Sequence, residues 1–223
     1  MQLVSIVGSP HGPRGNTTRL LQEVLAGAGG SGAKTETIYL SELTIRPCNG
    51  CDACHKFGNC VQQDDFASVR DRIAAADGLI LASPNYLFNV SAQLKALLDR
   101  CCGDIHLLGF RGKYGAAVVT SGGGGDEPVT DYLQRFLMIT GIHPVGAVHA
   151  TMGALVDGEF TPGLKHEARR LGERLVSTWR TGSRDPMVDQ EIRAFSLRMR
   201  QLVCTMKDEW LHEYQVWQTR TSD

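Results

Sequence analysis

The chain has 223 residues, enough for one large domain whose core needs no covalent crosslinks. Its 23 basic and 24 acidic residues leave a formal net charge of −1, which gives no basic surface for nucleic acid or an anionic membrane. The start MQLVSIVGSP lacks a basic n-region, and no run of 18 apolar residues occurs. We therefore expect a cytoplasmic protein with neither a nucleic-acid nor a membrane partner.

Short β-rich runs alternate with stretches that repeat apolar residues at helical spacing. The predicted strands are residues 3–8, 34–40, 78–84, 114–121 and 142–150. The predicted helices are residues 16–28, 64–77, 91–101, 128–140 and 164–179. Parallel strands need crossover connections, so this alternation predicts a doubly wound α/β domain over residues 1–182.

A C-terminal extension, residues 183–223, follows the break TGSRDP. Residues 187–218 contain no glycine or proline, which predicts one long helix, straight or bent. Its large apolar side chains favour a homodimer or homotetramer, although the helix packing back on its own domain is the alternative. These side chains are Phe195, Leu197, Leu202, Trp210, Leu211, Tyr214 and Trp217.

Three loops should meet at one edge, because ligands of open α/β sheets bind beyond the carboxyl ends of the strands. The first loop, GSPHGPRGNTTRL (8–20), places short hydroxyls and glycines directly before a helix, which favours a phosphate. It matches neither a P-loop nor a dinucleotide fingerprint. The alternative is a plain helix N-cap, with Asn16 and Thr17 satisfying free amides.

The second and third loops are SPNYLFNVS (83–91) and TSGGGGDE (120–127). Tyr86, Leu87 and Phe88 could wall a flat ring, although aromatic residues more often fill a core. Four successive glycines in the third loop would let the backbone approach a ligand, or would form a mobile turn.

Four cysteines crowd one segment, residues 46–63, with the spacing C-x2-C-x2-C-x5-C: Cys48, Cys51, Cys54 and Cys60. The chain has seven cysteines and no secretion signal, so a disulfide framework is not expected. Structural zinc sites usually pair two knuckles across a longer separation, whereas this run is closer to ferredoxin ligation. Spacing alone leaves zinc, a cluster, a redox disulfide and empty thiols open.

Taken in order, GSP…GNTTRL, SPNYLFNVSAQLKALLDR, TSGG and the clustered cysteines resemble the NADPH-dependent FMN reductase and iron–sulfur flavoprotein family. The resemblance covers nearly the whole chain and implies a flavodoxin-like five-stranded sheet of order 2-1-3-4-5. The cysteine segment would be a loop insertion and the tail a C-terminal helical extension. One departure is His11, which stands where the family commonly has arginine; Arg14 would supply that charge.

The resemblance implies FMN and one [4Fe-4S] cluster as cofactors. The first loop would hold the FMN phosphate through Ser9, His11, Arg14, Asn16, Thr17 and Thr18. The flavin ring would lie between Pro84, Asn85, Tyr86, Leu87 and Phe88 on one side and Ser121, Gly122, Gly123 and Gly124 on the other. Cys48, Cys51, Cys54 and Cys60 would bind the cluster.

The expected function is a flavin-dependent oxidoreductase that passes electrons from a one-electron donor such as ferredoxin through the cluster and FMN to a small acceptor. NAD(P)H is expected to be a poor direct donor, because no second nucleotide fingerprint is visible. The alternatives are an NAD(P)H-dependent FMN or quinone reductase without a cluster, and a non-enzymatic thiol redox sensor. No catalytic side chain and no histidine ligand is predicted. Cys101, Cys102 and Cys204 are expected to be buried structural residues.

Overall fold

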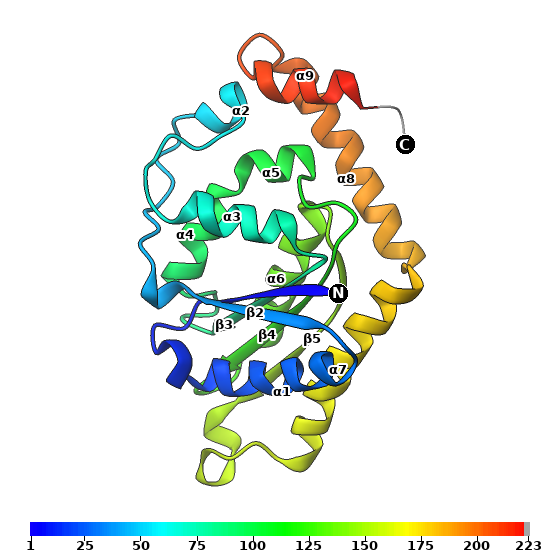
Figure 1. Ribbon diagram of the computed structural model, residues 1–223. Helices are drawn as coiled ribbons and strands as arrows, with labels where there is room; N and C mark the ends of the chain where they lie inside the picture. The colour runs from blue at the N-terminus through cyan, green and yellow to red at the C-terminus, as the bar shows by residue number, and fades with distance from the viewer. Residues whose placement is uncertain (221–223) are drawn as a thin grey trace.

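The computed structural model describes residues 1–220 and contains one parallel five-stranded sheet. The order β2-β1-β3-β4-β5 confirms the flavodoxin-like prediction (Figure 1). The strands are β1 (Gln2–Val7), β2 (Lys34–Tyr39), β3 (Gly78–Pro84), β4 (Tyr114–Ser121) and β5 (His143–Thr151).

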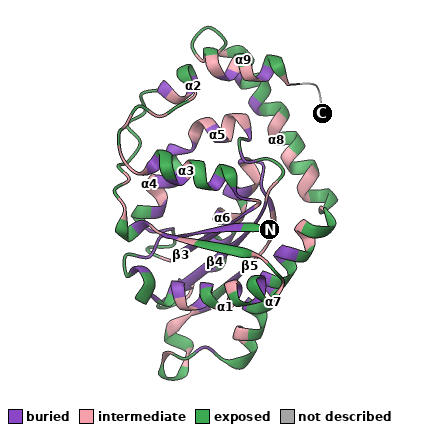
Figure 2. Ribbon diagram, viewed as in Figure 1, coloured by how far each residue is buried: buried purple, intermediate pink, exposed green. Residues whose placement is uncertain are grey.

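Every residue of the central strands β3 and β4 is buried, because helices cover both faces of the sheet (Figure 2). Leu79 and Leu81 of β3 pack into one core, while Ile80 and Ala82 pack into the other. Because successive side chains of a strand point to opposite faces of the sheet, β3 contributes to the apolar layers on both faces. The helices that cover the first layer are α3 (Phe66–Ala75), α4 (Ala92–Arg100) and α6 (Glu127–Ile139), and those that cover the second are α1 (Asn16–Gly30) and α7 (Pro162–Thr181).

The helices α1 and α7 pack backbone against backbone. A Cβ atom added at Gly27 of α1 would lie 2.0 Å from the carbonyl oxygen of Arg169, and one added at Gly172 of α7 would lie 2.0 Å from that of Val24. Only glycine therefore fits at these two positions, and the pair fixes how closely α7 approaches the sheet.

Short helices form within the connections. They are the 3₁₀ turns η1 (Gly12–Arg14), η2 (Leu40–Glu42), η3 (Met152–Ala154) and η4 (Val156–Gly158), and the α-helices α2 (Ala53–Phe57) and α5 (Cys102–Leu107). Periodicity did not predict α2 or α5, because one or two turns are too short to repeat an apolar pattern.

The sequence predicted one long helix for the tail, and this prediction is wrong. The tail forms two helices, α8 (Pro186–Thr205) and α9 (Leu211–Thr219). Gly182 ends α7 in the left-handed conformation, and Asp185 caps α8. The chain then turns between α8 and α9, and α9 lies beside α2 and α5 (Figure 1). Tertiary contacts therefore override the local helical preference of the sequence.

A third apolar cluster joins the tail to the domain. Val203 of α8 and Trp217 of α9 are buried with Leu108 at the end of α5. Phe195, Trp210 and Tyr214 are partly buried against the same cluster, whereas Leu197, Leu202 and Leu211 stay exposed. No helix within the described residues is both long and apolar enough to span a bilayer.

Candidate functional site

Three strand ends place the first, second and third loops at one edge of the sheet. Val7 at the end of β1 is in register with Ala82 of β3, and Pro84 of β3 is in register with Thr120 of β4. The hydroxyl of Ser91 donates a hydrogen bond to the carbonyl of Gly8 at 2.6 Å, which ties the second loop to the first. The loops are therefore held as one rim.

The first loop leads into α1 through η1. The N-cap of α1 is Gly15, and no side chain in the described part of the chain caps its first turn, so this helix end can receive an anion on its backbone amides. His11, Arg14 and Asn16 are exposed at this end, and Ser9 is buried beneath it. The plain N-cap interpretation of Asn16 is not supported, because Asn16 is itself the first helical residue.

The threonine hydroxyls of the first loop face inward. Thr17 Oγ1 hydrogen-bonds Thr120 Oγ1 at 2.7 Å, and Thr18 Oγ1 donates to the carbonyl of Gly12 at 2.6 Å. Both residues are buried. They hold the loop in shape, and a phosphate would meet their backbone amides before their side chains.

The second and third loops are joined by Asn85, whose Nδ2 donates to the carbonyls of Gly124 and Gly125 at 3.0 and 2.9 Å. Its Oδ1 is buried and has no hydrogen-bond partner among residues 1–220. A buried acceptor of this kind is costly unless a ligand supplies the donor. Open space surrounds a Cβ placed at Gly122, Gly123 or Gly124, so the backbone there is accessible.

The tip of the second loop is apolar and exposed. Tyr86 and Asn89 form an isolated bridge, and Leu87 and Phe88 between them have φ values of 53° and 61°. Non-glycine residues rarely adopt this conformation, so the tip stores strain. Tyr86 and Phe88 are 45 % and 75 % exposed, so the predicted alternative that these aromatic side chains fill the core is wrong. Together with the uncapped helix and the unpaired Asn85 oxygen, the rim fits the ring and phosphate of FMN.

The cysteine segment follows β2 and η2 and leads into α3. Cys48 and Cys51 are exposed, Cys54 and Cys60 are half-buried, and all four are free thiols. Gly50, Asp52 and Gly58 take left-handed conformations, so the segment curls tightly. The amide of Gly50 points at the sulfur of Cys48, 3.5 Å away.

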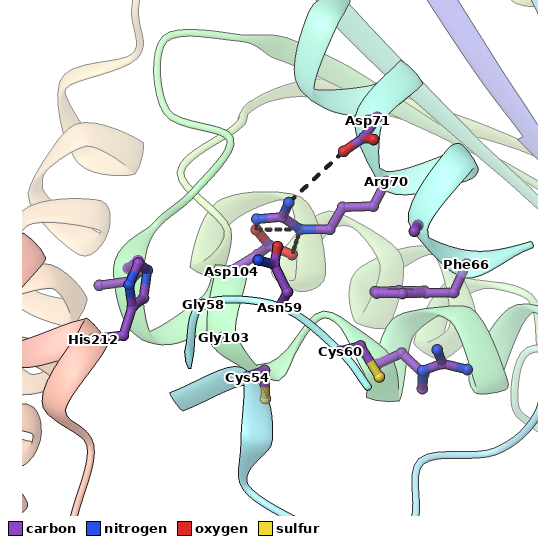
Figure 3. A pocket seen from close by; sticks show the side chains of 13 residues that line it. Cys54, Gly58, Asn59, Cys60, Phe66, Arg70, Asp71, Gly103, Asp104 and His212 are labelled. Atoms are coloured by element: carbon purple, nitrogen blue, oxygen red, sulfur yellow. Dashed lines mark hydrogen bonds and ion pairs between the residues drawn. The ribbon is translucent and has the colours of Figure 1, made fainter. Parts of the chain in front are cut away.

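A polar pocket of about 130 Å³ lies behind this segment, and Cys54 and Cys60 both line it (Figure 3). The Arg70 guanidinium crosses the pocket to bind both carboxylate oxygens of Asp104 at 2.7 to 3.1 Å. The described cysteines do not gather as ligands of a single ion. Iron–sulfur clusters are held by cysteine thiolates, and four free thiols on one tightly curled segment supply that type of ligand.

A buried ion pair anchors the segment. Arg100 of α4 binds both oxygens of Asp64 at 2.8 and 3.1 Å, and these side chains are 1 % and 2 % exposed. Arg100 also donates a hydrogen bond to the carbonyl of Arg46, and Asp64 accepts one from the backbone amide of Arg46. Burial opposes the charge of Asp64, but the hydrogen bonds from Arg100 and from the Arg46 and Phe66 amides outweigh it and lower its pKa.

A second group of ionisable side chains was missed by the sequence analysis. Glu213 of α9 is fully buried and accepts from Nδ1 of His55 at 2.6 Å and from Nδ1 of His106 at 3.0 Å. Burial acts against the charge of each group, but their mutual contacts, with the thiols of Cys102 and Cys54 beside His55, raise the histidine pKa values and lower that of Glu213. The three lie on different elements, so sequence spacing gave no signal.

This group has the residue types of a metal site but not the geometry. The rings of His55 and His106 stack with centroids 4.6 Å apart and planes 18° from parallel, and Trp210 packs against both. The lone pair of an imidazole nitrogen lies in the ring plane. Two nearly parallel rings therefore cannot direct both Nδ1 atoms at one ion, and the group is better described as a charged hydrogen-bond network.

The three remaining cysteines differ from one another. Cys101 is buried as predicted, and burial raises the pKa of its thiol. Cys204 of α8 is exposed, and Cys102 is half-buried beside His106, so the prediction that all three are buried is wrong for these two. The C-x3-H spacing of Cys102 and His106 was visible in the sequence, but the predicted helix ended at residue 101.

Known proteins resemble this chain in sequence and in fold. Residues 1–155, which include all three loops and the cysteine segment, match the model of a family described as NADPH-dependent FMN reductase. This chain belongs to that family. It is an FMN-dependent oxidoreductase, and the corresponding prediction is confirmed.

The family members that resemble this chain include iron-sulfur flavoproteins. The chain is 31 % identical over 225 residues to one from Archaeoglobus fulgidus, covering 99 % of both chains, so the likeness includes the tail. It is 39 % identical over 150 residues to another from Methanocaldococcus jannaschii, covering 66 % of this chain and 76 % of that one. Among solved structures, an apo NADH:FMN oxidoreductase has a TM-score of 0.60 and 21 % identity, covering 84 % of this chain and 92 % of that one, which supports the fold.

Proposed function

We propose that this family member holds FMN at the rim and a [4Fe-4S] cluster in the cysteine segment, and that it passes electrons from a one-electron donor such as ferredoxin to a small acceptor. Bound FMN exchanges one or two electrons and a cluster exchanges one, so the pair would convert between the two. The observation that carries the proposal is that four free thiols occupy one curled segment of a chain that also has a flavin rim.

In this proposal the chain's residues bind and orient the flavin. The phosphate lies at the start of α1, near Ser9, His11, Arg14, Asn16, Thr17 and Thr18. The ring lies between Pro84 to Phe88 and Ser121 to Gly124. Asn85 Oδ1, which has no partner among the described residues, would accept a hydrogen bond from the ring's polar edge. Leu87 and Phe88 exclude water from one ring face.

The cysteine segment supplies Cys48, Cys51, Cys54 and Cys60 as cluster ligands. Their support comes from the left-handed turns at Gly50 and Asp52, from the Gly50 amide near the Cys48 sulfur, and from the anchor between Arg100 and Asp64. The names of the curated relatives also favour a cluster over zinc or empty thiols.

The test begins with anaerobic purification. We expect about four irons and four acid-labile sulfides per chain, with a flavin spectrum overlaid by broad cluster absorption. Cys51→Ala should lose iron and keep FMN, and it should slow FMN reduction by reduced ferredoxin. Cys204→Ala is the matched control, because Cys204 is exposed on α8 outside the segment. Full iron content in Cys51→Ala, or unchanged reduction by ferredoxin, would contradict the proposal.

A second candidate has NAD(P)H reduce FMN directly, with a quinone-like acceptor and no cluster in the electron path. The NADPH-dependent family description favours it, although no second nucleotide fingerprint is present. Rapid reduction of the parent by NADPH under anaerobic conditions would support this candidate. Family membership favours either enzyme over a non-enzymatic thiol sensor.

A further inference from the structure

Cys102 begins a chain of three hydrogen-bonding side chains. Its sulfur lies 4.0 Å from Nε2 of His106, one helical turn further along α5. The other ring nitrogen of His106, Nδ1, bonds Glu213 at 3.0 Å. A thiol, an imidazole and a carboxylate in this order are the arrangement that activates a nucleophile: a base beside the thiol and a third group that orients the base.

The imidazole of His106 is held firmly in place. It lies against the rings of His55 and Trp210, with centroids 4.6 and 4.8 Å away. His55 occupies the other oxygen of Glu213, so the carboxylate cannot rotate without breaking a second hydrogen bond. Glu213 is thus a positioning residue, and His106 keeps one nitrogen directed at Cys102.

Cys102 is accessible from outside. It is half-buried and lines a pocket of about 270 Å³ between α4, α5 and α6. Apolar side chains form most of the pocket wall, namely Leu98, Ile105, Phe136 and Ile139. Arg135 also lines the pocket; it is exposed and makes no ion pair with another described residue.

The charged and titratable groups around Cys102 come from five helices: His55 of α2, Asp99 of α4, His106 of α5, Tyr132 and Arg135 of α6, and Glu213 of α9. Hydrogen bonds from His106 and His55 lower the pKa of the Cys102 thiol to about 6, against the opposing effect of burial. The adjacent Cys101 has no such partners, and burial raises its pKa. Reactive cysteines occur in partly exposed surroundings of this kind.

We propose that Cys102 is a nucleophilic thiol that exchanges with small disulfides carrying a carboxylate, bound in the pocket between α4, α5 and α6. The Cys102 thiol gives its proton to solvent, the protonated His106 stabilises the resulting thiolate through a hydrogen bond, and the thiolate attacks one sulfur of the disulfide. A bond forms between that sulfur and Cys102, the original sulfur–sulfur bond breaks, and the other half leaves as a thiolate. The incoming disulfide is the only oxidant.

The choice of a disulfide follows from what the residues supply. Thiol–disulfide exchange requires only a thiolate that the disulfide can reach. The sulfur that leaves carries its negative charge away as a thiolate, so the site need not supply a group to receive that charge. Acyl transfer would also require donors aimed at an oxyanion. Apolar walls suit the body of an organic disulfide, and the unpaired Arg135 suits a carboxylate. This inference does not depend on the cluster.

The test uses the purified holoprotein and dithionitrobenzoate, an aromatic disulfide with two carboxylates, with mass spectrometry to identify each modified cysteine. At pH 6 we expect Cys102 to react about tenfold faster than Cys204. About half of a thiol of pKa 6 is ionised there, against well under 1 % of an ordinary thiol, and the lower nucleophilicity of the weaker base removes part of that gain.

Three variants separate the roles. His106→Gln should lower the Cys102 rate severalfold towards that of Cys204, with His55 keeping part of the difference, and Glu213→Gln should lower it less. FMN content and the Cys204 rate confirm that each variant is folded. Arg135→Gln should slow dithionitrobenzoate severalfold and leave the uncharged dithiodipyridine unaffected. A Cys102 rate no greater than that of Cys204, or one unchanged by His106→Gln, would overturn the proposal. An equal effect of Arg135→Gln on both disulfides would overturn the carboxylate specificity.

Discussion

At the scale of single residues, the anchor between Asp64 and Arg100 decides whether the cysteine segment is ordered. Both side chains are almost completely buried, so removing one charge leaves the other without compensation. The sequence placed Asp64 at the start of a helix and Arg100 at the end of another, and nothing in either pattern indicated that they pair. A contact between residues 36 positions apart depends on how α3 and α4 pack, which local sequence does not specify.

Asp64→Asn should therefore destabilise the fold by about 3 to 5 kcal/mol, because it leaves Arg100 buried and unpaired. The midpoint temperature of thermal unfolding at pH 7 should then fall by roughly 6 to 20 °C. The control is Asp71→Asn, since Asp71 lies 3.9 Å from Arg70 but is largely exposed, and its loss should change stability by under about 1 kcal/mol. Equal effects of the two substitutions would contradict the role of burial.

The same pair gives a dependence on pH. The pKa of Asp64 is lowered in the folded chain, so its stabilising contribution is fully present above the unfolded value of about 3.9 and is lost as the pH falls towards the folded value. Chemical denaturation between pH 5 and pH 3 should show this loss in the parent. The loss should be smaller in Asp64→Asn, and parallel acid curves would contradict the assignment.

The phosphate site at the first loop can be tested through one atom. Asn16→Asp places a carboxylate at the exposed first residue of α1, where the helix dipole favours it, so the apoprotein should be at least as stable as the parent. The same carboxylate repels a bound phosphate, and the FMN dissociation constant should rise about tenfold, which corresponds to about 1.4 kcal/mol. Titration of the apoprotein with FMN measures this, with Asn16→Ser as the uncharged control. Unchanged FMN affinity in Asn16→Asp would place the phosphate elsewhere.

At the scale of elements, the sequence predicted what repeats and missed what does not. The five strands follow from short β-rich runs and the five long helices from apolar residues at helical spacing, and all were found within about two residues of their predicted bounds. The points at which one helix ends and the next begins were harder to predict. The helix α5 follows α4 almost directly through Cys101, and α8 and α9 are separate helices although no glycine or proline lies between them. The chemistry missed by the sequence lies at these breaks, since Cys102, His106 and Glu213 are on α5 and α9.

The close packing of α1 on α7 gives the test at this scale. Gly27→Ala places a methyl group on the Arg169 carbonyl, so the helices must separate, and the fold should lose about 1 to 3 kcal/mol. Gly29→Ala, in the same helix with open space around it, should instead be neutral or stabilising by up to about 1 kcal/mol. Urea denaturation of both variants measures the difference. A stabilising Gly27→Ala would contradict the observed packing.

At the scale of the whole molecule, the tail is divided between two roles. Its inner side joins the domain through Val203 and Trp217, so part of the apolar surface that predicted an oligomer is covered within the chain. Leu197, Leu202 and Leu211 remain exposed, and the prediction of an oligomer now rests on these three side chains. The sequence could identify these residues as apolar, but it could not divide them between the inner and outer sides of two helices.

We therefore expect a dimer or tetramer at micromolar concentration in light scattering. Leu197→Lys combined with Leu211→Lys should dissociate the oligomer into smaller units, because each lysine would have to be buried in the subunit interface without a partner. Val156→Lys, at a still more exposed apolar position on η4, should leave the mass unchanged. A monomeric parent protein would end this prediction.

The buried Glu213 also has a consequence for the order in which the protein is made. His55 leaves the ribosome 158 residues before its carboxylate partner does, and at ~5–20 residues per second this interval lasts roughly 8 to 32 s. Throughout that time the nascent cysteine segment has neither α9 above it nor the contacts of Trp210. Insertion of iron and sulfide into that segment during translation would meet a loop that α9 does not yet contact. The last helix would then pack beside α2, with Cys48 and Cys51 still exposed.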